Sequence, residues 1–479
     1  MVPPSRWIRP AAVIALAAIA LCRYTGRAIA IPQSTSTFLY ASIFEPLSGV
    51  DQFDAGTGGL IALSPLRVGG VSGPAGLAVS PDGTSLYVAD NAANTIAQYT
   101  VEGDGTLTLK NPATVVSGAG PNRLAVSPDG TSVYVANGRD GTVSQYDVFS
   151  GGTLVPKNPP TVPAGAFPDG ITVSPDGRSV YVTNRNDNTV SQYDVGAGGA
   201  LVPKRPATIA SATPVSIAAS PNGASVYVAN VDAGTVSQYD VGAGGVLAPK
   251  FPATVAAGPG SIDVVVSHDG TSVYVSNRGD SVAQFGVDPT AGTLSPKTPA
   301  RVPADCFGSG IGGLAITPDD TSLYVAGAGC GVIFQYDVEP GSGYLIPKSP
   351  AFVAADGSPA YLAVTARVAA ARITFSPTAL SFLKQKVGTI SASQTVMVAN
   401  TGSSTVTISG LSIIGPDSDE FRLSGDTCSG VILNPAGSCA ISVRFAPIAR
   451  GPASAALRVA STAPGASDLP LEGTTKPPK

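Results

Sequence analysis

A repeat of about 47 residues runs through most of the chain and restricts the folds it can form. Its clearest marker is a tyrosine in a short apolar run, at spacings of 47, 47, 47, 46, 47 and 50 residues: Tyr40, Tyr87, Tyr134, Tyr181, Tyr227, Tyr274 and Tyr324. Most of these runs follow a Ser-Pro-Asp-Gly turn or a variant of it, as at Ser80–Gly83. A fixed period of this length indicates an array of one supersecondary unit.

Each unit contains four short strand-like segments separated by turn residues. In the second unit they lie at Leu77–Val79, around Tyr87, at Gln98–Tyr99 and in a segment that ends in Lys110. Four strands in about 40 to 50 residues is the size of one β-propeller blade. A glutamine followed by Tyr or Phe recurs in every unit, and we expect the Tyr and Gln columns to pack between neighbouring blades.

A lysine recurs in the fourth strand, most often beside a proline. Its positions are Lys110, Lys157, Lys204, Lys250, Lys297 and Lys348. The outermost strand of a blade is a sheet edge, and Lys with Pro prevents such edges from pairing with other chains. We therefore interpret the lysines as exposed edge protection; a basic ladder that binds an acidic surface is the alternative.

The two ends of the repeat give the blade count. The first unit begins at Phe38 without its first strand, whereas Tyr361–Val364 supplies a first strand with no blade after it. The simplest arrangement has this last strand completing the first blade. The sequence thus predicts an all-β fold, a seven-bladed β-propeller closed by a C-terminal strand.

Composition agrees with this fold and excludes one class of partner. Gly (56) and Pro (42) are abundant, while charged residues make up only 13% of the 479 residues. Abundant Gly and Pro disfavour helices and favour turns. With 28 basic and 32 acidic residues, the chain lacks the positive charge that phosphate neutralisation requires, so we expect no nucleic-acid partner.

The N-terminus has the pattern of a secretory signal. Arg6 and Arg9 precede the apolar run Ala11–Cys22, and Ala28–Ala30 supplies a small-x-small cleavage site. We predict a signal peptide over residues 1–30 and a mature chain, beginning at Ile31, that does not span a membrane. An uncleaved membrane anchor is the alternative. The expected location is secreted, periplasmic or extracellular.

Three copies of a tetrapeptide carry a resemblance to a known family: Tyr134–Asn137, Tyr181–Asn184 and Tyr227–Asn230, each after an SPDG-like turn. Over residues 36 to 368 the chain resembles the YVTN-repeat propellers and the related lactonase-type seven-bladed propellers, which include bacterial 6-phosphogluconolactonases. The resemblance implies the fold for residues 31–368 and raises lactone hydrolysis as an activity.

The repeat ends after Val364, and residues 373–479, after a short linker at 369–372, predict a β-sandwich. Alternation of apolar and polar residues is visible at Thr395–Val398 and Ile441–Phe445. The order Val398–Gly402, Val443–Pro447 and Leu471–Gly473 resembles the Ig-like ASPM-SPD-2-Hydin family and the choice-of-anchor D modules. This resemblance implies a non-catalytic adhesive or spacer domain.

Four cysteines remain once the signal is removed: Cys306, Cys330, Cys428 and Cys439. An even number in an exported chain favours two disulfides over a metal site. We expect Cys428 to bridge Cys439, and Cys306 to bridge Cys330 in the seventh unit. A cysteine nucleophile is the alternative, but it needs a base, and the single histidine, His268, is predicted on the other face.

Candidate site residues lie on the face where the loops after the second strands meet the loops that lead into the first. We predict ligand contacts from polar residues of these loops: Asn137, Arg139, Asp140, Asn184, Arg185, Asp187, Asn230, Asp232, Asn277 and Arg278. Stabilisation of tight turns by the same side chains is the alternative. Among the residues entering the innermost strands only Arg123 and Asp263 are charged, and three blades separate them.

Two functions remain open from the sequence. The first is an exported, non-enzymatic propeller that binds a small polar ligand, a glycan or a cell-surface or extracellular protein, with the Ig-like domain as adaptor. The second is a lactonase-type hydrolase with Asp263 as base and Arg123 stabilising an oxyanion or an anionic substrate. No metal-binding motif occurs and no cofactor is predicted, although oxygen ligands would allow calcium.

Overall fold

The computed structural model describes residues 37–44, 48–56, 59–279, 281–304, 306, 310–366, 373–400, 405–434, 437–461 and 468–475. Within these ranges the elements are strands and four 3-10 helices, without an α-helix, so the all-β prediction is confirmed. None of the described helices is long and apolar enough to cross a membrane. The predicted signal segment lies outside the described residues.

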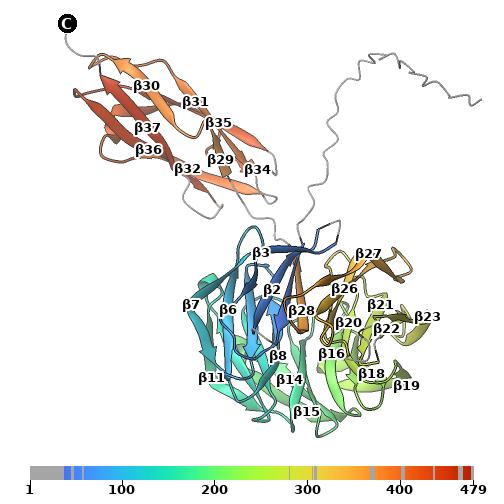
Figure 1. Cartoon of the computed structure of the whole chain (residues 1–479). Helices are drawn as coiled ribbons and strands as arrows, with labels where there is room; N and C mark the ends of the chain where they lie inside the picture. Colours follow the sequence, from blue (N-terminus) through green and yellow to red (C-terminus); the bar gives the residue numbers. More distant parts are fainter. Residues whose placement is uncertain are drawn as a thin grey trace, which may run out of the picture. The chain divides into compact units, whose positions relative to one another are not determined.

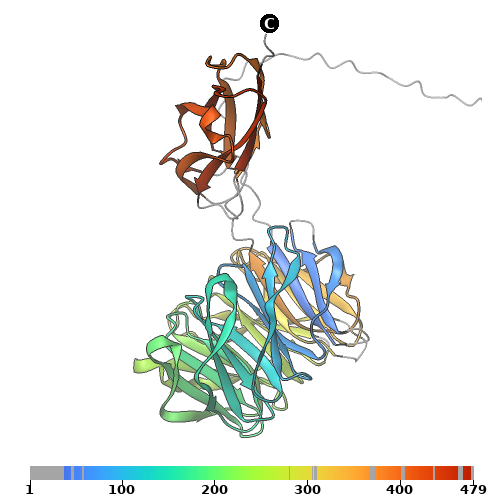
Figure 2. The same cartoon turned by 90° about the vertical axis from the view of Figure 1, so that its left-hand side faces the viewer.

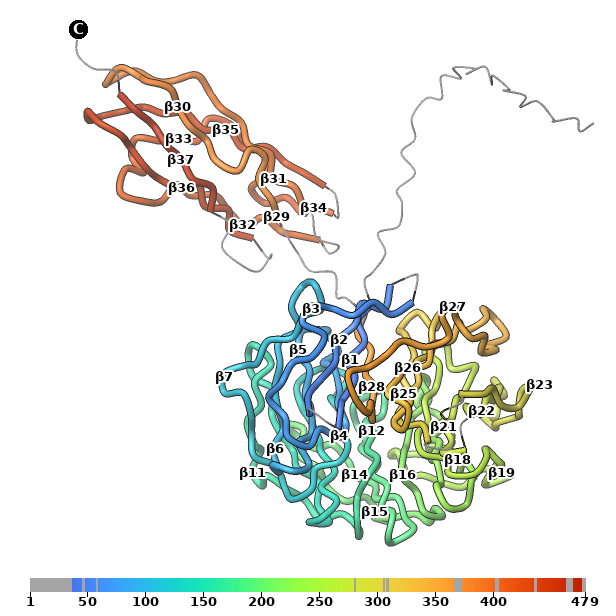
Figure 3. Tube along the Cα trace, viewed as in Figure 1, coloured from blue at the N-terminus to red at the C-terminus, as the bar shows by residue number. Residues whose placement is uncertain are grey.

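Seven four-stranded antiparallel sheets surround a central axis (Figures 1 and 3). From the innermost to the outermost strand, blade one is β28 (Pro359–Ala366), β1 (Thr37–Ile43), β2 (Gly49–Asp54), β3 (Ile61–Val68); blade two β4 (Pro74–Val79), β5 (Ser85–Asp90), β6 (Thr95–Val101), β7 (Leu107–Val116); blade three β8 (Pro121–Val126), β9 (Ser132–Asn137), β10 (Thr142–Val148), β11 (Leu154–Pro163); and blade four β12 (Pro168–Val173), β13 (Ser179–Asn184), β14 (Thr189–Val195), β15 (Leu201–Ala210).

The remaining three blades repeat this order. Blade five is β16 (Pro214–Ala219), β17 (Ser225–Asn230), β18 (Thr235–Val241), β19 (Leu247–Ala256); blade six β20 (Ser261–Val266), β21 (Ser272–Asn277), β22 (Ser281–Val287), β23 (Leu294–Pro303); and blade seven β24 (Leu314–Ile316), β25 (Ser322–Gly327), β26 (Val332–Val338), β27 (Leu345–Ala354). The ring closes through β28, which pairs antiparallel with β1 from Thr37↔Ala366 onward. The predicted closure is thereby confirmed.

The glutamine column joins each blade to the next through both ends of one amide. Gln98 Nε2 donates to the Pro112 carbonyl of its own outer strand at 3.1 Å, and its Oε1 accepts from the Leu154 N–H of blade three at 2.6 Å. The same two bonds recur at the other six positions: Gln52, Gln145, Gln192, Gln238, Gln284 and Gln335. Each buried amide is thus satisfied between two blades, as the repeat predicted.

Six of the seven repeat tyrosines join neighbouring blades through their hydroxyl groups, while the buried Tyr324 hydroxyl has no partner among the described residues. Tyr87 is fully buried and donates to the Gly152 carbonyl of blade three at 2.8 Å. Equivalent bonds start from Tyr40, Tyr134, Tyr181, Tyr227 and Tyr274. Burial raises the pKa of Tyr87 to about 12, so these phenols stay neutral donors at physiological pH.

The lysines of the fourth strand correct the edge-protection interpretation. Lys157 is only 7% exposed; its Nζ contacts Asp147 and donates to the Gly198 carbonyl of blade four at 2.6 Å. Strict alternation would place Leu154 and Lys157 on opposite faces, but the β10–β11 pairing contains a register shift and both are buried. Lys110, Lys204, Lys250 and Lys297 also donate to a carbonyl of the next blade, whereas Lys348 contacts Asp337 of its own blade. Five of the six lysines therefore connect neighbouring blades, and they form no exposed basic ladder.

The C-terminal strands, orange to red in Figure 2, form two sheets. One contains β29 (Ile373–Ser376), β31 (Gln394–Asn400), β35 (Ser438–Phe445) and β33 (Phe421–Asp426); the other contains β30 (Leu380–Gln385), β37 (Asp468–Thr475), β36 (Pro452–Ser461), β32 (Val406–Ile414) and β34 (Ile432–Leu433). Their inner faces share a core centred on Phe382, Phe421 and Phe445, with ring centroids 5.1 to 6.1 Å apart. This arrangement is a β-sandwich.

Both predicted disulfides are present, Cys306–Cys330 in blade seven and Cys428–Cys439 in the sandwich.

We expect replacement of Cys428 and Cys439 by alanine to lower the free energy of unfolding of the sandwich by about 3 kcal/mol. Without the disulfide, the unfolded chain gains the conformational entropy that closure of the loop between these cysteines, 11 residues apart, had removed. Urea denaturation of the oxidised protein measures this difference. An unchanged midpoint would contradict it, and the same comparison under reducing conditions is the control.

Candidate functional site

One residue at or beside each innermost strand occupies the equivalent position, directly before an apolar strand residue such as Leu77 or Leu124. In blade order from two to seven and then one, these are Gly76, Arg123, Gly170, Ser216, Asp263, Gly313 and Tyr361. The glycines allow close approach of neighbouring blades: a Cβ on Gly76 would lie 2.7 Å from the Cα of Arg123. The other four positions carry larger side chains.

Arg123 reaches across the channel to Asp263. Its Nη1 contacts Asp263 Oδ1 and donates to Ser216 Oγ at 2.7 Å, while Nη2 donates to the Ile262 carbonyl at 3.3 Å. The Tyr361 ring lies 4.9 Å from the guanidinium carbon, within cation–π range. The sequence placed the two charges on opposite sides of the channel, and the structure joins them in an ion pair.

Both oxygens of Asp263 have hydrogen-bond donors, and the ion pair with Arg123 uses Oδ1. Oδ1 also accepts the Ser216 hydroxyl at 2.5 Å, and Oδ2 accepts the Leu314 N–H at 2.8 Å. Each carboxylate oxygen of Asp263 thus already accepts a hydrogen bond from a protein donor, which leaves neither oxygen open to an attacking water. The geometry therefore argues against Asp263 as the general base and favours a role in holding Arg123.

The sequence analysis missed Asp169, which precedes the ring position Gly170. Its Oδ1 lies 3.9 Å from Arg123 Nε, and that Nε is a buried atom without a hydrogen-bond partner among the described residues. Burial raises the pKa of Asp169, against the opposing charges of Arg123 and Arg185. A sequence signal existed, because Asp169 is the one charged residue directly preceding a ring position.

The four asparagines predicted to contact a ligand are fully buried. Asn184 shows their environment: Nδ2 donates to Thr189 Oγ1 at 3.0 Å and to Ser191 Oγ at 2.8 Å. Asn137 makes equivalent bonds, and Asn277 donates to the Ala257 carbonyl. Asn230 has the opposite amide orientation, so that its oxygen accepts from Thr235 Oγ1 at 3.1 Å and Ser237 Oγ at 2.8 Å. These side chains stabilise the hairpins between second and third strands, which leaves them no surface for a ligand in this conformation.

The charged loop residues differ, since most of them are exposed: Arg139, Asp140, Asp187, Asp232 and Arg278, with Arg185 half-buried. Some also support the loops; Asp187 Oδ2 accepts the Ala166 N–H at 2.5 Å, and Arg139 donates to Asn91 at 2.9 Å. Ligand binding by these exposed side chains stays a prediction.

The disulfide removes Cys306 and Cys330 as nucleophiles in the oxidised protein. His268 lies in the turn after β20, where its Nδ1 is 2.9 Å from Asp320 Oδ1. Its turn and Asp263 lie at opposite ends of β20. Among the described residues no group of three His, Cys, Asp or Glu side chains is arranged to hold a metal ion.

Residues 59–154, 148–250 and 245–359 match the family model described as lactonase, 7-bladed β-propeller. The chain belongs to this family. Similar solved structures include a protein of Bacteroides fragilis with a provisional assignment as a 6-phosphogluconolactonase, at 22% identity and TM-score 0.59, covering 69% of this chain and 98% of that one. The periplasmic gluconolactonase of Pseudomonas aeruginosa has 21% identity and TM-score 0.57, covering 69% and 99%.

These identities establish the shared fold of the lactonase-family propeller and not its substrate. No curated protein sequence matches the chain. The family match covers strands from all seven blades and leaves the C-terminal sandwich outside it.

Proposed function

We propose that this lactonase-family propeller hydrolyses a lactone at the mouth of its central channel, with Asp169 as the acid–base group. The observation that carries the proposal is the pairing of Asp169 with the unpartnered Nε of Arg123, 3.9 Å away. General acid–base catalysis works best when the pKa of the group lies near the working pH. The raised pKa of Asp169 moves it in that direction.

The proposed reaction uses one water molecule. Asp169 accepts a proton as the water oxygen attacks the lactone carbonyl, and the Nε–H of Arg123 donates to the oxygen that becomes negative. The ring C–O bond then breaks, and the leaving oxygen takes the proton back from Asp169, giving a hydroxy acid. Asp263 and Ser216 hold the guanidinium in place, and such a fixed donor is effective because it needs no reorganisation.

A second candidate is ligand binding without turnover on the same face. It is favoured by the exposed cations Arg139 and Arg278 on the loops after the second strands, which suit a polar small molecule, a glycan or an extracellular protein. The two disulfides support an exported protein. In both cases we propose that the sandwich is a non-catalytic, Ig-like adaptor of the choice-of-anchor D type.

We expect Asp169→Asn to lower kcat/KM for lactone hydrolysis by about 10²- to 10⁴-fold, because asparagine cannot accept the proton from water. The assay is proton release by the purified mature chain on a panel of sugar and aliphatic lactones. Asp337→Asn, which removes an exposed carboxylate of blade seven, is the matched control and should retain activity. Equal rates for both variants would contradict the role of Asp169, and no turnover on any lactone would leave only the binding candidate.

A further inference from the structure

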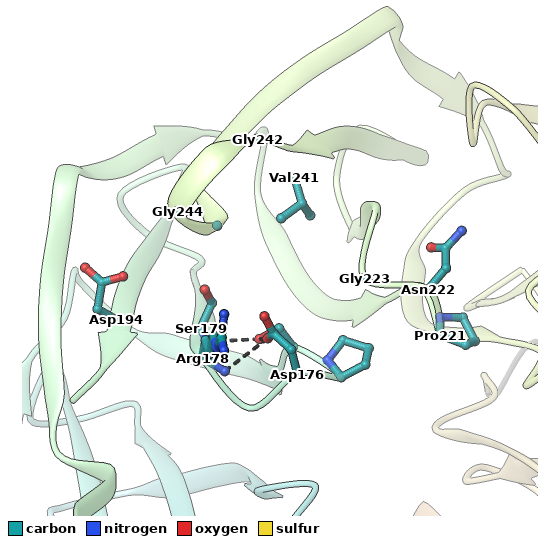
Figure 4. Close-up of a pocket in the computed structure, with 13 residues that line it drawn as sticks. Asp176, Arg178, Ser179, Asp194, Pro221, Asn222, Gly223, Val241, Gly242 and Gly244 are labelled. Atoms are coloured by element: carbon teal, nitrogen blue, oxygen red, sulfur yellow. Dashed lines mark hydrogen bonds between the residues drawn. The ribbon is translucent and has the colours of Figure 1, made fainter. Parts of the chain in front are cut away.

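On the face that carries the Ser-Pro-Asp-Gly turns, grooves lie between successive blades. Each is bounded by the turns of two neighbouring blades and by the loop between the third and fourth strands of the later blade. The groove between blades two and three has a volume of about 790 Å³ and that between blades four and five about 640 Å³. Figure 4 shows the second, where the turns at Asp176 and Pro221–Gly223 meet the loop containing Gly244.

In four blades the recurring lysine of the fourth strand forms an ion pair with a carboxylate on the third strand of the same blade. The pairs are Lys157 with Asp147, Lys204 with Asp194, Lys250 with Asp240 and Lys348 with Asp337. Asp194, one of the two labelled carboxylates in Figure 4, belongs to the third strand of blade four and lines this groove. In these four blades the third-strand carboxylate compensates for the loss of water around the lysine ammonium group.

Blade two has the lysine without its carboxylate, because Thr100 stands where blade three has Asp147. Lys110 is 8% exposed and lines the 790 Å³ groove. Its Nζ donates to the Gly151 carbonyl at 2.6 Å and to Thr100 Oγ1 at 3.3 Å, and it forms no salt bridge with a described carboxylate. A buried cation without an ion pair is destabilised, and burial lowers the pKa of Lys110 although the more distant charges of Asp82 and Glu102 raise it.

Blade six also lacks the carboxylate, with Gly286 at that position, but it compensates in another way. Lys297 Nζ lies 5.5 Å from the centre of the Tyr344 ring and donates to Ser272 Oγ at 2.9 Å. The loop of blade three has Thr153 at the position of Tyr344. Blade two thus has neither the carboxylate nor the aromatic ring beside its lysine.

We propose that the groove between blades two and three binds a small hydroxycarboxylate, whose carboxylate pairs with Lys110 where blade three uses Asp147. This groove and Asp169 are at opposite ends of the blades, so the proposal is independent of lactone hydrolysis. The proposed ligand site lies on the face that carries the turns, at the one lysine of the repeat that, among the described residues, lacks both a third-strand carboxylate and an aromatic neighbour.

The other groups in the groove select the rest of the ligand. Asp82 and Asp129 also line it. Each uses Oδ1 to accept bonds within its own turn, as Asp82 does from the N–H and hydroxyl of Thr84, while Oδ2 accepts none from the described residues. A bare anion would be repelled by them, whereas hydroxyl groups can donate to the open oxygens. Phe149, 57% exposed, adds an apolar wall.

The test uses trifluorolactate and the full mature chain, with fluorine NMR line broadening as the measure of binding. We expect saturable binding, and Thr100→Asp should weaken it at least about tenfold, because the new carboxylate restores the pair seen in blade three. Lys110→Met should have the same effect by removing the cation. Thr100→Ser adds no carboxylate at this position, so this variant should bind trifluorolactate as tightly as the parent protein does.

Two further measurements separate this site from non-specific attraction. The neutral amide trifluorolactamide should bind at least about tenfold more weakly, and Asp194→Thr should create a second site in the groove of Figure 4. The proposal is overturned if the parent protein does not broaden the signal. It is also overturned if Thr100→Asp and Lys110→Met bind unchanged, if the amide binds as well as the acid, or if Asp194→Thr leaves the number of sites at one.

Discussion

Asp263→Asn is expected to lower the free energy of unfolding of the propeller by about 3–5 kcal/mol, the usual cost of removing one partner from a buried ion pair. The substitution removes the carboxylate in direct contact with the Arg123 guanidinium and leaves only Asp169, whose Oδ1 is 3.9 Å from Nε. Arg123 stays charged in the variant because a guanidinium does not lose its proton in proteins. In the parent protein desolvation lowers the pKa of Arg123, but Asp263, Tyr361 and Asp169 together raise it above the ordinary value. Guanidinium denaturation of the full chain, followed at the propeller transition, measures the loss.

Two variants test whether charge is the cause. Ser216→Ala removes one hydrogen bond from the same cluster and should cost only about 1 kcal/mol. The double variant Arg123→Met with Asp263→Leu removes both charges and should recover most of the stability lost in Asp263→Asn, because an apolar pair needs no counter-charge. If the double variant is no more stable than the single one, the explanation by charge is wrong.

Ending the chain after Gly357 is expected to prevent the propeller from folding. Without β28, the inner edge of β1 loses its partner along the whole strand, from Thr37 to Ile43, and Leu362 is missing from the core between blades seven and one. The exposed backbone of β1 would then be open to pairing with other chains. We expect insoluble or aggregated protein, measured by size-exclusion chromatography and circular dichroism of the soluble fraction.

The matched control is a chain ending after residue 372, which keeps β28 and omits the sandwich. It should give a soluble monomer with the β-sheet spectrum of the propeller, since the sandwich has a core of its own built around Phe382, Phe421 and Phe445. A soluble, cooperatively folded chain ending at Gly357 would show that β28 is not needed to close the ring.

The features that recur in every unit were predictable because periodicity multiplies a weak local signal. Gln98 alone indicates little, but the same residue at seven equivalent positions predicts one environment, and all seven amides bridge neighbouring blades. The closing strand was predictable for the same reason, since the first unit lacked a segment that the end of the array supplied.

The departures from the repeat were harder to interpret. Lys157 follows the pattern of an edge residue, yet a register shift between β10 and β11 turns it toward Asp147 and the next blade. Arg123 and Asp263 were recognised as unusual, but their direct contact depends on how far an arginine reaches across the channel. Asp169 was missed because its importance comes from the neighbouring Arg123 Nε, 46 residues away in the sequence.

The sequence by itself determined the blade, the number of blades, the closure of the ring and the pairing of the four cysteines. The first three follow from local strand and turn preferences of neighbouring residues, repeated at one period. The cysteine pairing follows from an even number of cysteines in a chain with an export signal. Only the tertiary structure decided which charges meet: Arg123 with Asp263, Asp169 beside the unpartnered Arg123 Nε, and Lys110 without a salt bridge to a described carboxylate. Coulomb energy and desolvation depend on distances of a few ångströms between residues far apart in the chain, and those distances exist only after folding.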